Sequence, residues 1–129
     1  MNTANEQNDD RGKSFDFESD VLKASHPVLV MFFTAWSQPC RVLKKVVKRF
    51  EETCGGRVKV IKINADDHPG LSLLYDIQSI PALLYFINGK VSARSVGTVS
   101  TAAIRSQWQS ILEELGQAKQ AKGKTKTIK

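Results

Sequence analysis

Runs of apolar residues along the chain mark the strands of a buried sheet. Six consecutive apolar residues, Val28–Phe33, are typical of a parallel strand that is covered on both faces. A second strand is predicted over Val58–Asn64. A third apolar run follows Pro81, and the pair Asn88-Gly89 within it predicts a tight hairpin between two strands.

A long helix is predicted between the first two strands. It opens near Pro39 and ends at the glycine pair of residues 55–56, which is a common helix stop. Its apolar positions keep helical spacing and are Leu43, Val46, Val47 and Phe50.

Three further helices complete the pattern. A short helix capped by Ser19 precedes the first strand and turns Val21 and Leu22 toward the core, and another is opened by Pro69. The last helix takes as its inward face Ile104, Trp108, Ile111, Leu112 and Leu115. This order of elements predicts an α/β domain whose central mixed sheet is flanked by helices on both faces.

The chain is long enough for one folded domain with a polar segment at each end. We expect a flexible acidic segment over residues 1–16, a folded domain over 17–116 and a flexible lysine-rich tail over 117–129. The tail holds five lysines and no acid. Because no aromatic residue interleaves with these lysines to stack on bases, we expect no nucleic-acid partner.

The chain has 129 residues and a net charge of +6, and it shows no sign of a membrane span or of export. No segment reaches the roughly 18 consecutive apolar residues of a span, and the first residues lack the apolar core of a signal peptide. Two cysteines in such a chain indicate free thiols in a reducing compartment. We therefore expect a cytoplasmic monomer without a metal ion or another cofactor.

Several spaced motifs of the chain resemble the thioredoxin family, without a gap from about Asp20 to Leu112. These motifs are "DVLKA", "VLV", Trp-x-x-Pro-Cys, "INADDHPG", Tyr-x-Ile-x-x-Ile-Pro, Phe-x-Asn-Gly and Val-Gly. The resemblance implies the thioredoxin fold. The family's N-terminal edge strand is weak or absent here, because "NDDRGKS" shows no apolar alternation.

The resemblance also implies an active-site loop and a substrate groove. Trp36 flanks the loop "SQPC" of residues 37–40, Pro81 matches the family's cis-proline, and Ile80 and Gly97 match residues that line its groove. The predicted substrate-binding residues are Trp36, Gln38, Pro39, Ile80, Pro81 and Gly97.

Ser37 and Cys40 occupy the two catalytic positions of the family. Ser37 stands in place of the attacking cysteine, and its hydroxyl neither ionises at pH 7 nor forms a disulfide, so we interpret it as a helix N-cap. Cys40 matches the resolving cysteine. Cys54 lies 14 residues further along the same helix, about 21 Å away, which is too far for a disulfide with Cys40.

Two further positions depart from the family pattern. Met31 stands where the family has a buried aspartate that assists proton transfer, and Phe33 stands where it usually has a tryptophan. Together with Ser37 and Gln38, these differences indicate natural divergence of the whole site.

The diverged site predicts a thioredoxin-like protein that has lost dithiol–disulfide oxidoreductase chemistry and is not an active thioredoxin-type disulfide reductase. Its groove would bind protein partners or non-native polypeptides in a chaperone-like role. The sequence Ser-Gln-x-Cys is similar to the site of one chaperedoxin branch, although the helical repeats of that branch are absent. The alternative is a one-cysteine thiol–disulfide oxidoreductase in cell redox homeostasis that uses Cys40, with glutathione as a candidate substrate.

A third hypothesis rests on four basic residues at helical spacing. Arg41, Lys44, Lys45 and Lys48 share one face of the long helix and would suit an acidic partner or nucleic acid. The alternative for this face is simple solvation.

Overall fold

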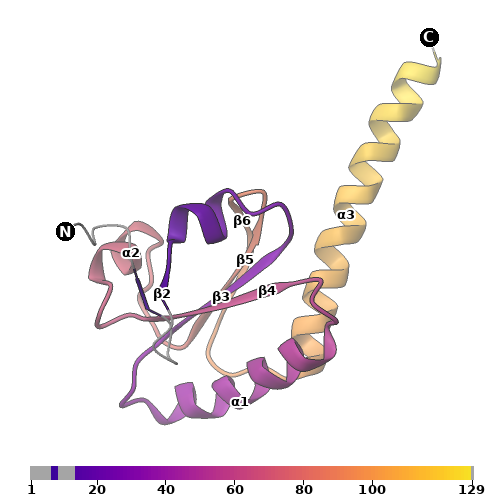
Figure 1. Cartoon of the computed structure of the whole chain (residues 1–129). Coiled ribbons are helices and arrows are strands. Elements are labelled where there is room, and N and C mark those ends of the chain that lie inside the picture. Colours follow the sequence, from indigo (N-terminus) through magenta and orange to yellow (C-terminus); the bar gives the residue numbers. More distant parts are fainter. Residues whose placement is uncertain (1–6, 9–13, 129) are drawn as a thin grey trace.

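The centre of the computed structural model is a four-stranded mixed sheet in the order β4-β3-β5-β6 (Figure 1). The structure describes the backbone of residues 7–8 and 14–128 and the side chains of residues 16–116. Strand β3 (Val28–Phe33) pairs in parallel with β4 (Lys59–Asn64) and antiparallel with β5 (Ala82–Ile87), which pairs antiparallel with β6 (Lys90–Val96). The predicted strands and their mixed pairing are confirmed.

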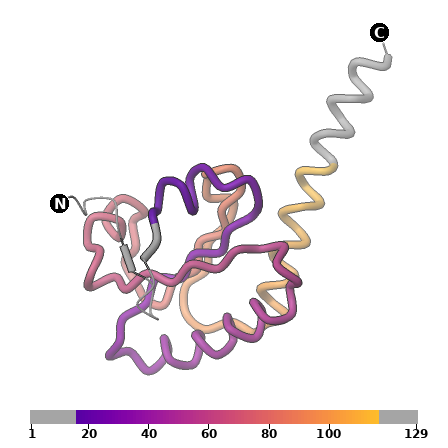
Figure 2. The backbone as a smooth tube through the Cα atoms, in the orientation of Figure 1, coloured from indigo at the N-terminus to yellow at the C-terminus, as the bar shows by residue number. Residues whose placement is uncertain are grey.

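Helices cover both faces of this sheet, as the order of elements predicts. Helices α1 (Gln38–Thr53) and α3 (Thr101–Ile128) lie on one face, and the short helices η1 (Glu18–Leu22) and α2 (Pro69–Leu74) lie on the other (Figures 1 and 2). Two more strands, β1 (Gln7–Asn8) and β2 (Ser14–Phe15), pair with each other and not with β4.

Strand β3 contributes side chains to the core on both faces of the sheet, because successive side chains of a strand point to opposite faces. The side chains on the α1 and α3 face are Leu29, Met31 and Phe33. Those on the η1 and α2 face are Val28, Val30 and Phe32. All six residues are buried, so the unbroken apolar run in the sequence reflects a strand that is covered on both faces.

The hairpin between β5 and β6 turns at the predicted residues. Asn88 and Gly89 both adopt positive φ, 51° and 80° respectively, which the favoured two-residue hairpin turn requires. The backbone oxygen of Leu22 lies where a Cβ on Gly89 would stand, so only glycine fits at this point.

The first short helix differs from its prediction in how it starts. It begins at Glu18, and Ser19 is an exposed residue within the helix rather than its cap. The carboxylate of Asp16 accepts a hydrogen bond from the Glu18 backbone N–H at 3.1 Å instead. Val21 is fully buried as expected, but Leu22 is exposed because a five-residue helix turns only a narrow face toward the core.

An ion pair fastens this first helix to strand β4. Lys59 Nζ lies 3.0 Å from Asp20 Oδ1, and Asp20 Oδ2 accepts the backbone N–H of Asp16 at 2.9 Å. Burial raises the pKa of Asp20, but the hydrogen bonds from Asp16 and Lys59 and the charge of Lys59 outweigh it, so the pKa is lower than its ordinary value of 3.8.

The last helix is longer than its buried face. Ile104, Trp108 and Ile111 are buried as predicted, whereas Leu112 and Leu115 are exposed. The prediction is wrong for these two leucines. Leu112 lines an open pocket beside the end of α1 instead of packing in the core, and α3 continues past the end of the sheet (Figure 1). None of the helices described in the structure is both long and apolar enough to cross a membrane.

The predicted domain limits fall at the ends of the described chain. Helix α3 continues to Ile128 and so includes most of residues 117–129, for which we expect a flexible tail. Most of the acidic segment of residues 1–16 lies outside the described residues. The three-part division of the chain therefore stays a prediction.

Candidate active site

Helix α1 begins at the loop of residues 37–40. Ser37 has extended backbone angles, φ −90° and ψ 123°, and its Oγ accepts a hydrogen bond from the Cys40 N–H at 3.3 Å. Pro39 lies in the first turn, where a backbone N–H would have no acceptor within the helix, so proline loses no hydrogen bond there. Ser37 thus caps α1, as its side-chain chemistry predicts.

Cys40 lies beneath this first turn. Its side chain is 1% exposed and packs in the core cluster that also holds Met31 and Phe33. Ser37 is 7% exposed, so both family catalytic positions are shielded in this conformation. The thiol lies at the N-terminal end of α1, beside the capping Ser37.

Trp36 covers the outside of the loop and is 70% exposed. Its Nε1–H donates a hydrogen bond to Asp66 Oδ2 at 3.1 Å, and Asn64 Oδ1 accepts the backbone N–H of Asp66 at 2.9 Å. Sequence reasoning missed Asp66 as a site residue. The available signal was its place directly after β4, because parallel neighbours such as β3 and β4 end at the same edge of a sheet.

Part of the predicted groove lies at one end of the central sheet. The Ile80–Pro81 peptide bond is cis, and the carbonyl oxygen of Pro81 accepts the Gly97 N–H at 2.8 Å. Ile80 is half-buried against the core cluster. Because Phe32 pairs with Ala82, the end of β3 that leads to Trp36 lies at the same end of the sheet as Pro81.

The basic face of α1 is partly used inside the molecule. The Arg41 guanidinium donates two hydrogen bonds, one to Gln38 Oε1 at 2.7 Å and one to the Ala35 carbonyl oxygen at 3.5 Å. Lys44 Nζ lies 3.9 Å from the centroid of the Phe33 ring, in a cation–π contact that the sequence did not suggest. An acidic partner for this face therefore stays a hypothesis that rests mainly on the exposed Lys45 and Lys48.

Both cysteines of the chain are free thiols. Cys54 forms the C-cap of α1, is half-buried, and its Sγ contacts the carbonyl oxygens of Glu51 at 3.4 Å and Val58 at 3.6 Å. It packs at the helix end, as expected. Within the described part of the chain, no three His, Cys, Asp or Glu residues are grouped as a metal site.

Comparisons with known proteins place this chain in a family. A family model described as Thioredoxin matches residues 10–110. Thioredoxin from Acidithiobacillus ferridurans is 40% identical over 88 residues, which cover 68% of this chain and 82% of that protein. Thioredoxin from Synechocystis sp. is 38% identical over 96 residues, or 74% and 90% of the two chains. Thioredoxin C-2 from Corynebacterium nephridii is 35% identical over 99 residues, or 77% and 88%.

These comparisons contradict the main functional hypothesis from the sequence. The relatives carry the name Thioredoxin, and neither they nor the family model support a loss of redox chemistry or a chaperone-like role. The alternative, a one-cysteine oxidoreductase, agrees better with them. The mixed sheet, the capped loop before α1 and the family match over residues 10–110 together show that the chain belongs to the thioredoxin family.

Proposed function

We propose that this protein is a thiol–disulfide oxidoreductase that works with one active-site thiol, Cys40. The relatives named Thioredoxin support the redox chemistry. The observation that carries the proposal is the place of Cys40 in the first turn of α1, beside the capping Ser37. The loop "SQPC" is then a one-thiol variant of the family's active-site loop, and the chaperedoxin likeness extends no further than these residues.

The chemistry needs only one thiol on the protein. The Cys40 thiolate attacks a substrate disulfide R–S–S–R′, the substrate S–S bond breaks, and R′–S⁻ leaves and takes a proton from water. A second thiol, such as glutathione, then attacks the mixed disulfide at the substrate sulfur and releases the Cys40 thiolate. Ser37 takes no part in electron transfer and positions the helix turn that holds Cys40.

Access to Cys40 sets the first requirement of this reaction. Because the side chain is 1% exposed, the first turn of α1 must open before a disulfide reaches the sulfur. The Ser37 cap hydrogen bond at 3.3 Å is the contact that such an opening breaks. This bond therefore opposes the reaction as well as supporting the helix.

The substrate disulfide would be carried in the groove beside the loop. Trp36 is the exposed apolar surface there, and Gln38 and Pro39 are exposed next to it. Ile80 and Pro81 border the same end of β3. We propose that these residues and Gly97 contact the peptide that carries the disulfide.

The cellular setting that we propose is a reducing one. Free thiols at Cys40 and Cys54 suit the cytoplasm, where disulfides are kept reduced. We propose a monomer with a folded domain over residues 17–116, an acidic segment before it and a lysine-rich tail after it.

A comparison of two serine variants tests this function. Wild type, Cys40→Ser and Cys54→Ser are incubated with glutathione disulfide and weighed intact by mass spectrometry, with peptide mapping of the adduct. Glutathione-dependent reduction of 2-hydroxyethyl disulfide is measured in parallel. We expect a Cys40 adduct and turnover for wild type and Cys54→Ser, and neither for Cys40→Ser. Equal turnover of Cys40→Ser and wild type would contradict the proposal.

A further inference from the structure

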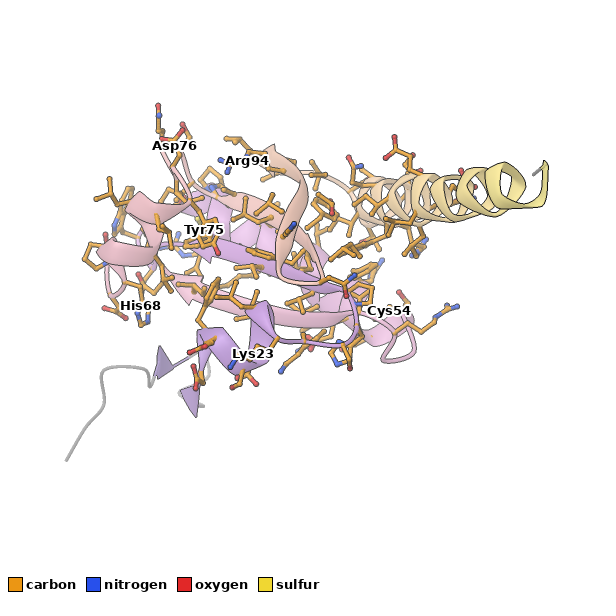
Figure 3. The ribbon with its side chains drawn as sticks, turned by 90° about the horizontal axis from the view of Figure 1, so that it is seen from above. Lys23, Cys54, His68, Tyr75, Asp76 and Arg94 are labelled. Atoms are coloured by element: carbon orange, nitrogen blue, oxygen red, sulfur yellow. The ribbon has the colours of Figure 1, made fainter. Side chains whose placement is uncertain are left out.

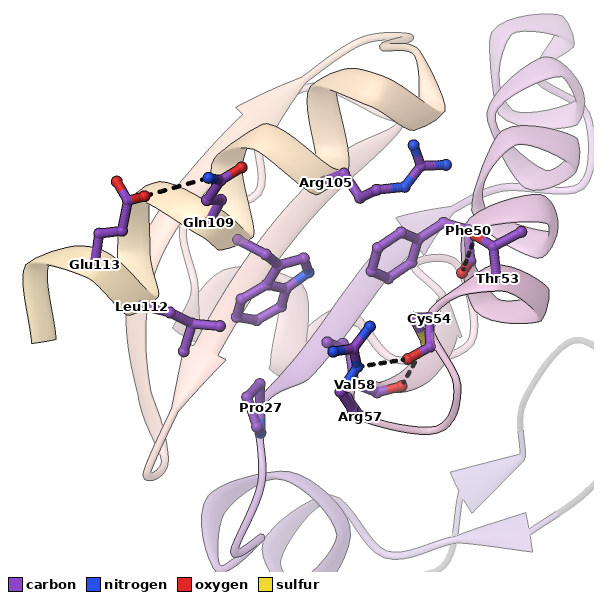
Figure 4. Close-up of a pocket in the computed structure, with 11 residues that line it drawn as sticks. Pro27, Phe50, Thr53, Cys54, Arg57, Val58, Arg105, Gln109, Leu112 and Glu113 are labelled. Atoms are coloured by element: carbon purple, nitrogen blue, oxygen red, sulfur yellow. Dashed lines mark hydrogen bonds between the residues drawn. The ribbon is translucent and has the colours of Figure 1, made fainter. Parts of the chain in front are cut away.

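A pocket of about 510 Å³ opens where the end of α1 meets α3 (Figure 4). This volume is in the range of small-molecule binding sites. Residues that line the pocket include Phe50, Cys54, Arg57, Arg105, Trp108 and Leu112. The pocket therefore combines apolar, cationic and thiol side chains.

The pocket is remote from the proposed redox site. Cys54 lies 14 residues after Cys40 on the same helix, about 21 Å along its axis. In Figure 3, Cys54 and His68 lie toward opposite ends of the sheet, and His68 belongs to the loop that also carries Asp66. A ligand in the pocket does not touch the loop of residues 37–40.

The apolar wall of the pocket is formed by buried residues of the core. Phe50 and Trp108 are 2% and 4% exposed and belong to the core cluster. Trp108 Nε1 is buried without a hydrogen-bond acceptor among the described residues. Because solvent does not reach this nitrogen, the part of the indole that lines the pocket is apolar.

The positive charges of the pocket gather at one end. Figure 4 shows Arg57 and Arg105 on either side of the Phe50 ring, with Glu113 at the far end of the pocket. Arg57 is held in place because its Nε–H donates to the Cys54 carbonyl oxygen at 3.2 Å. Glu113 Oε2 accepts from Gln109 Nε2 at 3.2 Å. Two guanidinium groups near one apolar wall suit a carboxylate.

We infer that this pocket binds a small carboxylate with an apolar body. The carboxylate binds at the end of the pocket that Arg57 and Arg105 line, where their guanidinium groups supply donors for its oxygens. The apolar body packs against Phe50, Trp108 and Leu112. The charge separation and the apolar wall of the pocket point to the same kind of ligand.

Octanoate is a suitable probe because it carries one carboxylate and an apolar chain and does not absorb where tryptophan does. In the variant Trp36→Phe, Trp108 is the only tryptophan that remains, so its emission reports on the pocket alone. We expect a saturable change in emission with a dissociation constant below about 1 mM. Octanamide, which has the same chain without the charge, should bind at least about tenfold more weakly.

Variants of exposed arginines test the assigned contacts. Arg57→Gln and Arg105→Gln should each weaken octanoate binding at least about tenfold. Arg49→Gln removes the same charge from α1 at an exposed residue that does not line the pocket, and should change binding less than about twofold. Thermal unfolding of each variant checks that the fold is retained.

The Cys54 thiol gives an independent readout in the otherwise unchanged protein. Octanoate should slow alkylation of Cys54 by iodoacetamide and leave the rate at Cys40 unchanged. The inference is overturned by any of three results: no saturable emission change, octanamide that binds as tightly as octanoate, or equal weakening by Arg49→Gln and the two pocket variants.

Discussion

The indole Nε1–H of Trp36 donates to Asp66 Oδ2 at 3.1 Å and joins the loops that follow β3 and β4. The two residues lie 30 positions apart in the sequence. A residue that is 70% exposed would otherwise be held by few contacts, so this hydrogen bond fixes the most exposed ring of the candidate groove.

Asp66→Ala should release the Trp36 ring with little loss of stability, because an exposed hydrogen bond contributes only about 1 kcal/mol. In ¹⁵N NMR, the Trp36 indole signal should shift and exchange faster with solvent, whereas the Trp108 signal stays in place. Asp67→Ala removes a neighbouring exposed carboxylate and is the matched control. Equal effects of the two variants on Trp36 would argue against the fixing role of Asp66.

Removing the cap of α1 should destabilise the domain and open the site. Ser37→Ala deletes the acceptor for the Cys40 N–H and should cost about 0.5 to 2 kcal/mol in denaturant unfolding. Because the same hydrogen bond closes the turn over Cys40, alkylation of Cys40 should become faster. Ser37→Thr keeps an acceptor and serves as the control. A slower or unchanged rate for Ser37→Ala would show that the cap does not limit access.

The two cysteines should differ in reactivity in the folded protein. Cys40 is 1% exposed and Cys54 is half-buried, so iodoacetamide should label Cys54 first. Peptide mapping over time gives the two rates. In denaturant the rates should converge, because burial is then lost. Faster labelling of Cys40 in the folded state would contradict the shielded geometry.

Ser37→Cys should restore a dithiol site. The variant recreates Cys-x-x-Cys at the start of α1 and should form an intramolecular disulfide with Cys40 in air. Its disulfide reductase rate should stay below that of ordinary thioredoxins, because Met31 cannot accept a proton from Cys40. General acid–base help is typically worth about 10² to 10⁴ in rate.

Adding Met31→Asp to that variant should raise the rate further. Met31 is fully buried, and its neighbour in the parallel pairing of β3 with β4 is the buried Lys62. The new carboxylate should lower stability because a charge becomes buried. The measurement is a rate comparison of the single and double variants with the same reductase at fixed pH. Full thioredoxin activity of Ser37→Cys alone would make the missing aspartate irrelevant.

The pair of Asp20 and Lys59 should make stability depend on pH at the acidic end. The lowered pKa of Asp20 means that its contribution is complete above pH 3.8 and is lost as pH falls through its folded-state pKa. Asp20→Asn should therefore be destabilised at pH 7, and its deficit should shrink below pH 3.8. Glu18→Gln, which breaks the exposed pair with Lys23, is the control and should have little effect. A deficit independent of pH would contradict the assignment.

The sequence predicts well what depends on neighbouring residues. The bounds of β3 follow from its apolar run, and the start of α1 follows from Ser37 and Pro39. Periodicity could not show where the opposing layer ends, so Leu112 and Leu115 were placed inward wrongly. Periodicity also does not show that both short helices, η1 and α2, lack a side-chain cap.

Contacts between distant segments of the site were not predictable in the same way. The hydrogen bond of Trp36 with Asp66 and the cation–π contact of Lys44 with Phe33 depend on how loops and helices pack. The functional hypothesis failed for a related reason. It gave more weight to the change at Ser37 than to the similarity of the rest of the chain to the thioredoxin family. That similarity is seen in the relatives named Thioredoxin.

Strand β3 has a hydrogen-bonded neighbour on each side and helices on both faces, and every one of its residues is buried. Its amides should therefore exchange with deuterium only when the whole domain unfolds, while the first turn of α1 exchanges through a smaller local opening. Amides that exchange slowly and amides that exchange faster should therefore lie only a few residues apart in the chain. In the proposed mechanism the strand therefore stays in place, and the motion that exposes Cys40 is confined to the turn that follows it.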